Sequence, residues 1–141
     1  MAEPIERIRG GWRLSTDRRR VQVDVVHGFV SSSYWARGIP RAIVERSIEN
    51  SLCFGVYDAG GAGREKQVAF ARVISDFATF AWIADVFVLS EHRGRGLGVW
   101  LMALIEIPHL CSAKFLTLGR GQGSGSWPVR VARRLVSARA W

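Results

Sequence analysis

The chain has 141 residues, of which 48% are hydrophobic and 23% are charged, and its formal net charge is +8. This length suits one domain with a buried core. No apolar stretch approaches the roughly 20 residues of a membrane-spanning helix, and the first residues lack the apolar centre of a secretion signal. We therefore expect a cytoplasmic protein of one domain and exclude a membrane partner.

Most of the net positive charge lies near the C-terminus. Five of the twenty basic residues and none of the twelve acidic ones follow residue 118. A nucleic-acid interpretation would therefore depend on this tail. A basic run is more often a solvated face, and this tail lacks the interleaved aromatic residues of a base-stacking surface. A basic interaction protein is a minor alternative, and nucleic acid is an unlikely partner.

The chain reads in order as a short strand, two helices, three strands, a helix and a last strand. Residues 1–11 are polar and predict a loosely held lead-in, and residues 119–141 predict an atypical tail rich in glycine and arginine. Short turns between the three middle strands predict an antiparallel meander. The expected strands cover residues 12–15, 52–57, 67–75, 82–89 and 114–118, and the expected helices begin near residues 23, 41 and 99.

The two cysteines, Cys53 and Cys111, lie among apolar residues and lack the spacing of metal ligands. In a reducing compartment such residues are usually buried free thiols. We expect no disulfide and no metal.

The stretch 81–106 is the most informative part of the chain, because an apolar strand runs into the glycine turn RGRGLG at residues 93–98 and then into an apolar helix. Free backbone N–H groups at a helix start bind anions such as phosphate. A dinucleotide site is excluded, because the preceding strands are antiparallel and no carboxylate follows Glu106. A P-loop is excluded because no Gly-Lys-Ser/Thr closes the turn.

The sequence VLSEHRGRGLG at residues 88–98 resembles the acetyl-CoA motif of the GCN5-related N-acetyltransferase (GNAT) superfamily. In that motif a strand ending in valine precedes Arg/Gln-x-x-Gly-x-Gly/Ala. The resemblance covers about residues 12–118 and includes FGVYD and YWARGIP. It implies an α+β fold in α/β/α layers, with a mixed, mostly antiparallel sheet flanked by helices. An incomplete C-terminal part is an open alternative.

The resemblance also implies acetyl-CoA as cosubstrate, a primary amine as acceptor and homodimers as a common state. In the family the diphosphate rests on turn amides, and the pantetheine arm lies beside the strand before the turn. A backbone N–H of that strand, here of Val88, stabilises the oxyanion. The cofactor-binding residues implied for this chain are Val86, Phe87, Val88, Arg93, Gly94, Arg95, Gly96, Leu97, Gly98 and Val99.

Amine acetylation also needs a group that receives the ammonium proton. Asp85 on the central strand is the first candidate and Asp76 at the preceding turn is the second. By strand alternation Asp85 would point away from Ala84 and Val86, so a hydrogen bond on the strand face is the alternative role. Between the two helices, Tyr34, Trp35 and Arg37 are candidates for substrate binding, with loop packing as the alternative.

The acid for the departing thiolate is commonly a tyrosine after the fifth strand in this family, in a segment reading Gly-Leu-Tyr-x-x-Phe-Gly-Phe. No tyrosine follows Leu118, and Tyr57, at a strand end, is expected to pack in the core or at the sheet edge. An N-acetyltransferase is therefore the first hypothesis, and a CoA-binding remnant with little turnover is the second. In another reading frame, codons for residues 127–131 can encode Gly-Pro-Phe-Gly-Phe, so a frameshift near residue 119 is a further hypothesis.

Overall fold

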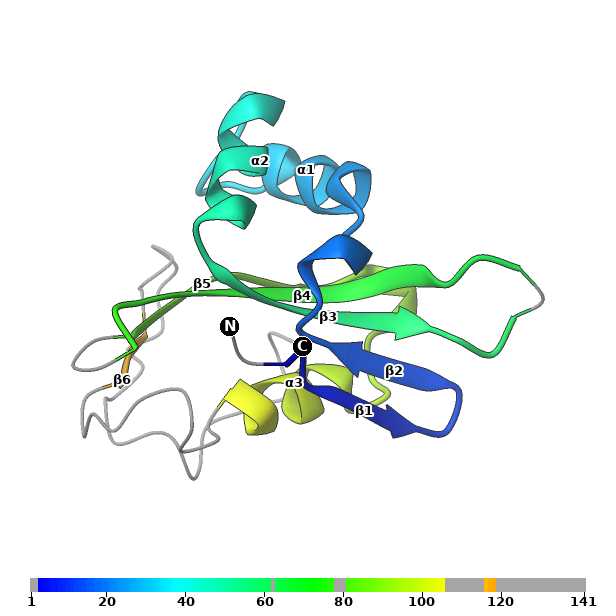
Figure 1. Cartoon of the computed structure of the whole chain (residues 1–141). Helices are drawn as coiled ribbons and strands as arrows, with labels where there is room; N and C mark the ends of the chain where they lie inside the picture. Colours follow the sequence, from blue (N-terminus) through cyan, green and yellow to red (C-terminus); the bar gives the residue numbers. More distant parts are fainter. Residues whose placement is uncertain (1–2, 62, 78–80, 106–115, 119–141) are drawn as a thin grey trace.

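A six-stranded sheet forms the middle layer of the computed structural model, and helices cover both of its faces (Figure 1). The structure describes residues 3–61, 63–77, 81–105 and 116–118. The sheet order is β1-β2-β3-β4-β5-β6, and every neighbouring pair is antiparallel except β5 and β6. The expected α+β fold, with a mixed and mostly antiparallel sheet, is confirmed.

The elements follow the predicted order with one addition at the N-terminus. The strands are β1 (Glu6–Arg9), β2 (Trp12–Ser15), β3 (Leu52–Asp58), β4 (Lys66–Ser75), β5 (Ala81–Val88) and β6 (Leu116–Leu118). The helices are α1 (Val23–Ser32), α2 (Arg41–Glu49) and α3 (Leu97–Ile105), with short 3₁₀ turns η1 (Arg18–Arg20) and η2 (Ser90–His92). The predicted tail, Cys111 and the end of the third helix lie outside the described residues.

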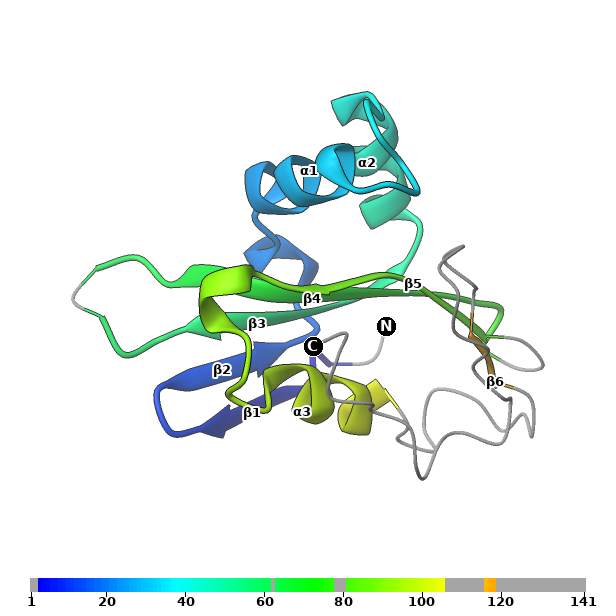
Figure 2. The same cartoon turned by 180° about the vertical axis from the view of Figure 1, so that it is seen from behind.

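Two apolar clusters hold the layers together. Helix α3 packs on one face of the sheet, and α1 and α2 pack on the other, as Figures 1 and 2 show from opposite sides. Burial of this apolar surface from water is the main driving force for the packing. The α3 side buries Leu97, Leu101 and Ile105 against Phe54, Ile83 and Val88. The other side buries Val26, Val30, Val44 and Ile48 against Phe70 and Phe87.

The N-terminal strand corrects the prediction of a loose lead-in at residues 1–11. Strand β1 pairs with β2 around Gly10, whose φ of +58° suits glycine. Its Glu6 carboxylate contacts Arg13 at 2.9 Å and Arg20 at 3.0 Å. The polar sequence carries little apolar signal, because side-chain ion pairs and backbone pairing stabilise this strand.

A β-bulge interrupts the pairing of β4 and β5. Phe70 is paired with Phe87, and Arg72 is paired with Ala84. One residue of β4 therefore faces two residues of β5, Asp85 and Val86, which is the arrangement of a bulge. Asp85 has a φ of +52°, a left-handed value that few residues other than glycine adopt.

The bulge corrects the predicted direction of Asp85. Before it, Ile83 packs toward α3, and after it Val86 and Val88 do so. Asp85 binds Arg72, whose register partner is Ala84. Asp85 and Ala84 therefore lie on the same face, the one covered by α1 and α2, because a bulge breaks strict alternation.

Candidate functional site

Two glycines shape the turn between β5 and α3, which we call the anion turn (residues 93–99; Figure 2). Gly94 has a φ of +77° and Gly96 a φ of +74°. A residue with a side chain is strained at such a positive φ, even where space for the side chain is available. At Gly94 a Cβ would meet no atom within 4 Å, so backbone conformation and not crowding requires glycine there.

Three amides of the anion turn lie before the first backbone hydrogen bond of α3. The first backbone bond at this end of α3 runs from Trp100 N to Gly96 O, at 3.1 Å. The N–H groups of Leu97, Gly98 and Val99 precede it and have no acceptor within the helix. The positive end of the helix dipole adds to them, so this end of α3 favours an anion.

Arginines surround the same turn. Arg93 Nε donates to Val88 O at 2.9 Å, which ties the turn back to the end of β5. The Arg95 guanidinium lies 5.7 Å from the centre of the Trp12 ring. Arg9, from β1, donates to Gly96 O at 3.2 Å. The anion turn therefore combines amides that have no acceptor in the helix with cationic side chains.

The outer edge of β5 next to the turn is unpaired in the described part of the chain. Strand β6 pairs only with residues 81–83 of β5. Leu89 N donates to Val68 O of β4 at 2.8 Å, and successive N–H groups of a strand point to opposite edges. The N–H of Val88 is therefore directed away from β4, to the open edge.

An acidic–aromatic cluster, formed by Asp85, Arg72, Trp35 and Tyr34, lies on the α1–α2 face. Arg72 Nε donates to Asp85 Oδ2 at 2.8 Å, and the two side chains are only 15% and 18% exposed. Trp35 Nε1 donates to Asp85 Oδ1 at 3.3 Å. Arg72 Nη1 donates to Ser51 Oγ at 3.1 Å, which fixes the guanidinium. The bulge thus presents a carboxyl group with a defined orientation.

Aromatic rings connect this carboxylate to the core. Phe29 stacks on Phe87 at 4.0 Å and contacts Trp35 at 6.2 Å, between ring centres. Tyr34 packs edge-on against Trp35 at 5.1 Å. Tyr34 and Trp35 remain 60% and 41% exposed, so the outer rings can contact a ligand.

Comparisons with known proteins give the family. A sequence model of the acetyltransferase (GNAT) family matches residues 46–114. A candidate acetyltransferase of Gibberella zeae is 31% identical, over 83% of this chain and 77% of its own length. The chain belongs to the GNAT family of acetyltransferases. This membership confirms the resemblance read from residues 88–98.

Solved GNAT-like structures agree with the family and the fold. A crystal structure of a candidate GNAT acetyltransferase from Xanthomonas campestris pv. campestris is 44% identical and has a TM-score of 0.70, covering 79% of this chain and 76% of its own. A structure from Deinococcus radiodurans is 19% identical, with a TM-score of 0.62 and coverage of 82% and 77%. A structure from Staphylococcus aureus is 20% identical, with a TM-score of 0.59 and coverage of 77% and 79%. The last two support the fold alone.

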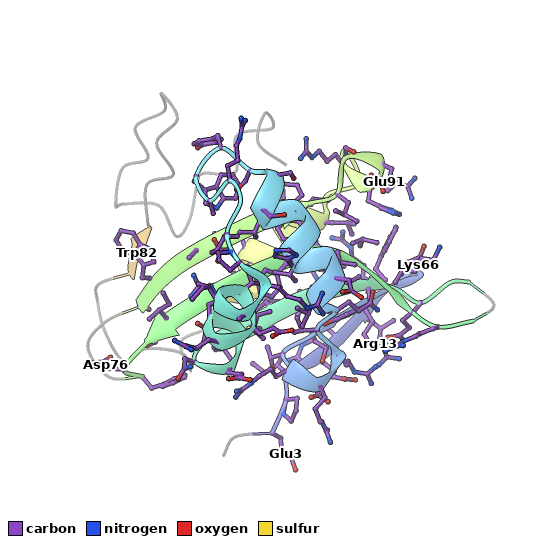
Figure 3. All side chains as sticks on the ribbon, turned by 90° about the horizontal axis from the view of Figure 1, so that it is seen from above. Glu3, Arg13, Lys66, Asp76, Trp82 and Glu91 are labelled. Atoms are coloured by element: carbon purple, nitrogen blue, oxygen red, sulfur yellow. The ribbon has the colours of Figure 1, made fainter. Side chains whose placement is uncertain are left out.

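The GNAT fold brings some of the predicted site residues together and separates others. Trp35 reaches Asp85, and Tyr34 reaches Trp35. Arg37 is exposed and has no ion pair within the described ranges. Asp76 (labelled in Figure 3) follows the end of β4, past the pair Ser75–Ala81. The strand register therefore places it several residues along the sheet from Asp85.

Two members of this neighbourhood were missed from the sequence, Arg72 and Arg9. A charged residue inside the apolar strand VAFARVI was a usable signal for Arg72, because a charge rarely enters a buried strand without a partner. Arg9 gave no such signal. Its contact with the anion turn spans 87 residues of sequence.

Tyr57 and Cys53 are core residues, as predicted. The Tyr57 hydroxyl is buried without a hydrogen-bond partner, and burial raises its pKa well above the ordinary value. Its ring lies over Gly55, where a Cβ would be 2.3 Å from the hydroxyl oxygen. Cys53 is a buried free thiol. Within the described ranges no group of three potential ligands could hold a metal, and no helix is long and apolar enough to cross a membrane.

Proposed function

We propose that this protein is an N-acetyltransferase that transfers an acetyl group from acetyl-CoA to a primary amine of a small molecule or peptide. The observation that supports this proposal most directly is the anion turn beside an edge of β5 that is unpaired among the described residues. The acidic–aromatic cluster lies at the bulge of the same strand. GNAT acetyltransferases generally use acetyl-CoA. Its anionic diphosphate fits a helix start that combines backbone amides, glycines and arginines.

On the donor side, the amides of residues 94–99 would hold the diphosphate, and Arg93 and Arg95 would add charge. The glycines support this role, since no side chain at Gly94 or Gly96 keeps phosphate from the backbone. The open edge at Val86–Val88 would lie along the pantetheine arm. The Val88 N–H would then stabilise the oxyanion, a contribution of about 2.7–4 kcal/mol for donors of this type.

On the acceptor side, Asp85 would orient the amine and receive its proton through water. Its contact with Arg72 at 2.8 Å holds the carboxyl group in one orientation at the bulge. The charge of Asp85 is largely offset by Arg72, so the cluster offers no excess negative charge to a polycation. The exposed rings of Tyr34 and Trp35 favour an amine that carries an apolar or aromatic group.

A CoA-binding protein with little turnover is the second candidate, and the position of Tyr57 favours it. The departing thiolate needs a proton. Tyr57 is buried in the core and its raised pKa opposes proton donation. Of the two tyrosines in the chain, only Tyr34 is exposed, and it belongs to the acidic–aromatic cluster.

Calorimetry and thiol release test these proposals in turn. Titration with acetyl-CoA should show binding, whereas a basic interaction protein that lacks a donor site would show none. Release of free CoA thiol is then measured with phenethylamine, tryptamine, spermidine and lysine as acceptors. Turnover that is fastest with the aromatic amines supports the proposed acceptor. Binding without turnover across the whole panel supports the second candidate.

A further inference from the structure

The N-terminal hairpin contacts the anion turn from far away in the sequence. Arg9 Nη2 donates to the carbonyl oxygens of Gly96 at 3.2 Å and of Arg95 at 3.4 Å. The same guanidinium lies 4.7 Å from the centre of the Trp100 ring on α3. Figures 1 and 2 show β1, the edge strand of the sheet, beside α3. Helix α3 covers the face of the sheet opposite to α1 and α2.

A second residue of the hairpin contacts the segment just before the turn and the turn itself. The Trp12 ring meets His92 edge-on, with the ring centres 5.6 Å apart. It also lies under the Arg95 guanidinium at 5.7 Å. The hairpin therefore touches the segment before Gly94, the arginine between the glycines and the first turn of α3.

The contacts of Arg9 are on the carbonyl side of the turn, which fixes the opposite side. A trans peptide unit is planar, and its C=O and N–H point in opposite directions. The carbonyls of Arg95 and Gly96 belong to the same peptide units as the N–H groups of Gly96 and Leu97. When Arg9 holds these two carbonyls, the two N–H groups are directed away from the hairpin.

Such a contact is useful because glycine turns are otherwise permissive. Two glycines with positive φ leave many alternative conformations, and a ligand that selects one of them loses affinity to the entropy of ordering. Side-chain hydrogen bonds that order the turn beforehand reduce that loss.

We propose that Arg9 is a positioning residue that orients the phosphate-binding amides of the anion turn, with Trp12 supporting it. This inference rests on acetyl-CoA being the donor. Arg9 acts through the backbone of the turn, so its effect is restricted to donors that carry the diphosphate.

The hairpin itself has other supports, so Arg9 can be changed without removing β1. Glu6 and Glu65 each contact both Arg13 and Arg20, at 2.9–3.3 Å. Ile5 and Thr16 extend the pairing of the hairpin by hydrogen bonds of 2.8 and 3.0 Å. Arg7 of the same strand supplies a matched control, because within the described part of the chain its side chain bonds only the carbonyl of Glu6.

The experiment compares Arg9→Gln with Arg7→Gln on two donors, acetyl-CoA and acetyl-pantetheine, which lacks the diphosphate. For Arg9→Gln we expect KM for acetyl-CoA to rise about tenfold with kcat within about twofold, the size expected when charge-assisted hydrogen bonds are lost. The kcat/KM for acetyl-pantetheine should be unchanged, and Arg7→Gln should match the wild type with both donors. Equal losses with both donors, or no loss with acetyl-CoA, would overturn the proposal.

A ligand-free measurement separates this proposal from the proposed function. Amide hydrogen exchange at Gly96 and Leu97 should be faster in Arg9→Gln than in Arg7→Gln, while exchange in β3 and β4 stays the same. Unchanged exchange at the turn overturns the role of Arg9, even if the wild type acetylates amines. If exchange is faster in Arg9→Gln but the wild type binds no acetyl-CoA, Arg9 still orders the turn. Its role in acetyl-CoA binding is then overturned, together with the proposed function.

Discussion

The two sides of the candidate site are built in different ways. The anion turn offers backbone amides, and its glycines take left-handed conformations without strain. The acidic–aromatic cluster offers side chains, and its central residue, Asp85, takes a left-handed conformation that costs a non-glycine residue about 1–2 kcal/mol. The bulge, Arg72 and Trp35 hold it there.

The difference suggests a division of labour. A turn that binds through its main chain can bind any donor with the same diphosphate. It therefore needs glycines at the left-handed positions and few particular side chains. A face made of side chains recognises a particular acceptor, and it depends on how β4, β5 and the loop after α1 meet. Substitutions on the two sides should therefore change different kinetic constants.

The largest effect is expected from Asp85→Asn. Asparagine tolerates the left-handed backbone but cannot take up a proton, so kcat should fall by about 100-fold or more. The dissociation constant of acetyl-CoA should change by less than about threefold, since the anion turn is untouched. Steady-state kinetics and calorimetry measure both quantities. Asp76→Asn is the control, and equal activity of Asp85→Asn and wild type would remove Asp85 from the chemistry.

The converse effect is expected from Gly96→Ala. A Cβ at a φ of +74° strains the turn, so the affinity for acetyl-CoA should fall about tenfold, with little change in kcat once the donor saturates. The control is Gly61→Ala, because its Cβ would meet nothing within 4 Å and no left-handed φ is present. An equal affinity in the two variants would show that the turn does not bind the donor.

A smaller effect on the acceptor alone is expected from Trp35→Ala. This change removes the hydrogen bond to Asp85 and one exposed ring, so KM for an aromatic amine should rise about fivefold, with acetyl-CoA affinity unchanged. Ile43→Ala is the control, because Ile43 is similarly exposed on α2. A loss of donor affinity in Trp35→Ala would contradict the separation of the two sides.

The smallest effect is expected at Cys53, a buried residue of β3 whose register partner is Arg72, and it concerns stability and not kinetics. Burial raises the pKa of its thiol to about 11. The unfolded thiol ionises first as the pH rises, so the stability contributed by the neutral buried thiol is present below about pH 9 and is lost between there and pH 11. Wild type should lose about 2 kcal/mol more than Cys53→Ala across this range in denaturant unfolding. Identical pH profiles would contradict a buried, protonated thiol.

Local patterns in the sequence were sufficient for the meander, for the helix that begins after Pro40 and for the anion turn. Strand alternation and turn residues act over a few positions. A glycine between a strand and a helix indicates locally a backbone position where a positive φ is tolerated. The GNAT resemblance at residues 88–98 rests on the same local chemistry, which is why it could be read before the fold.

Only the tertiary structure decided which side chains meet. Alternation gave the wrong face for Asp85, because an extra residue in β5 depends on its pairing with β4. The N-terminal strand was missed, because ion pairs with distant residues hold a sequence that has little apolar character. Arg9 reaches Gly96 only because the hairpin lies beside α3. The sequence by itself therefore determined the anion turn, whose backbone geometry is local. The acidic–aromatic cluster and the hydrogen bonds of Arg9 to the turn arise from contacts that only the folded sheet creates.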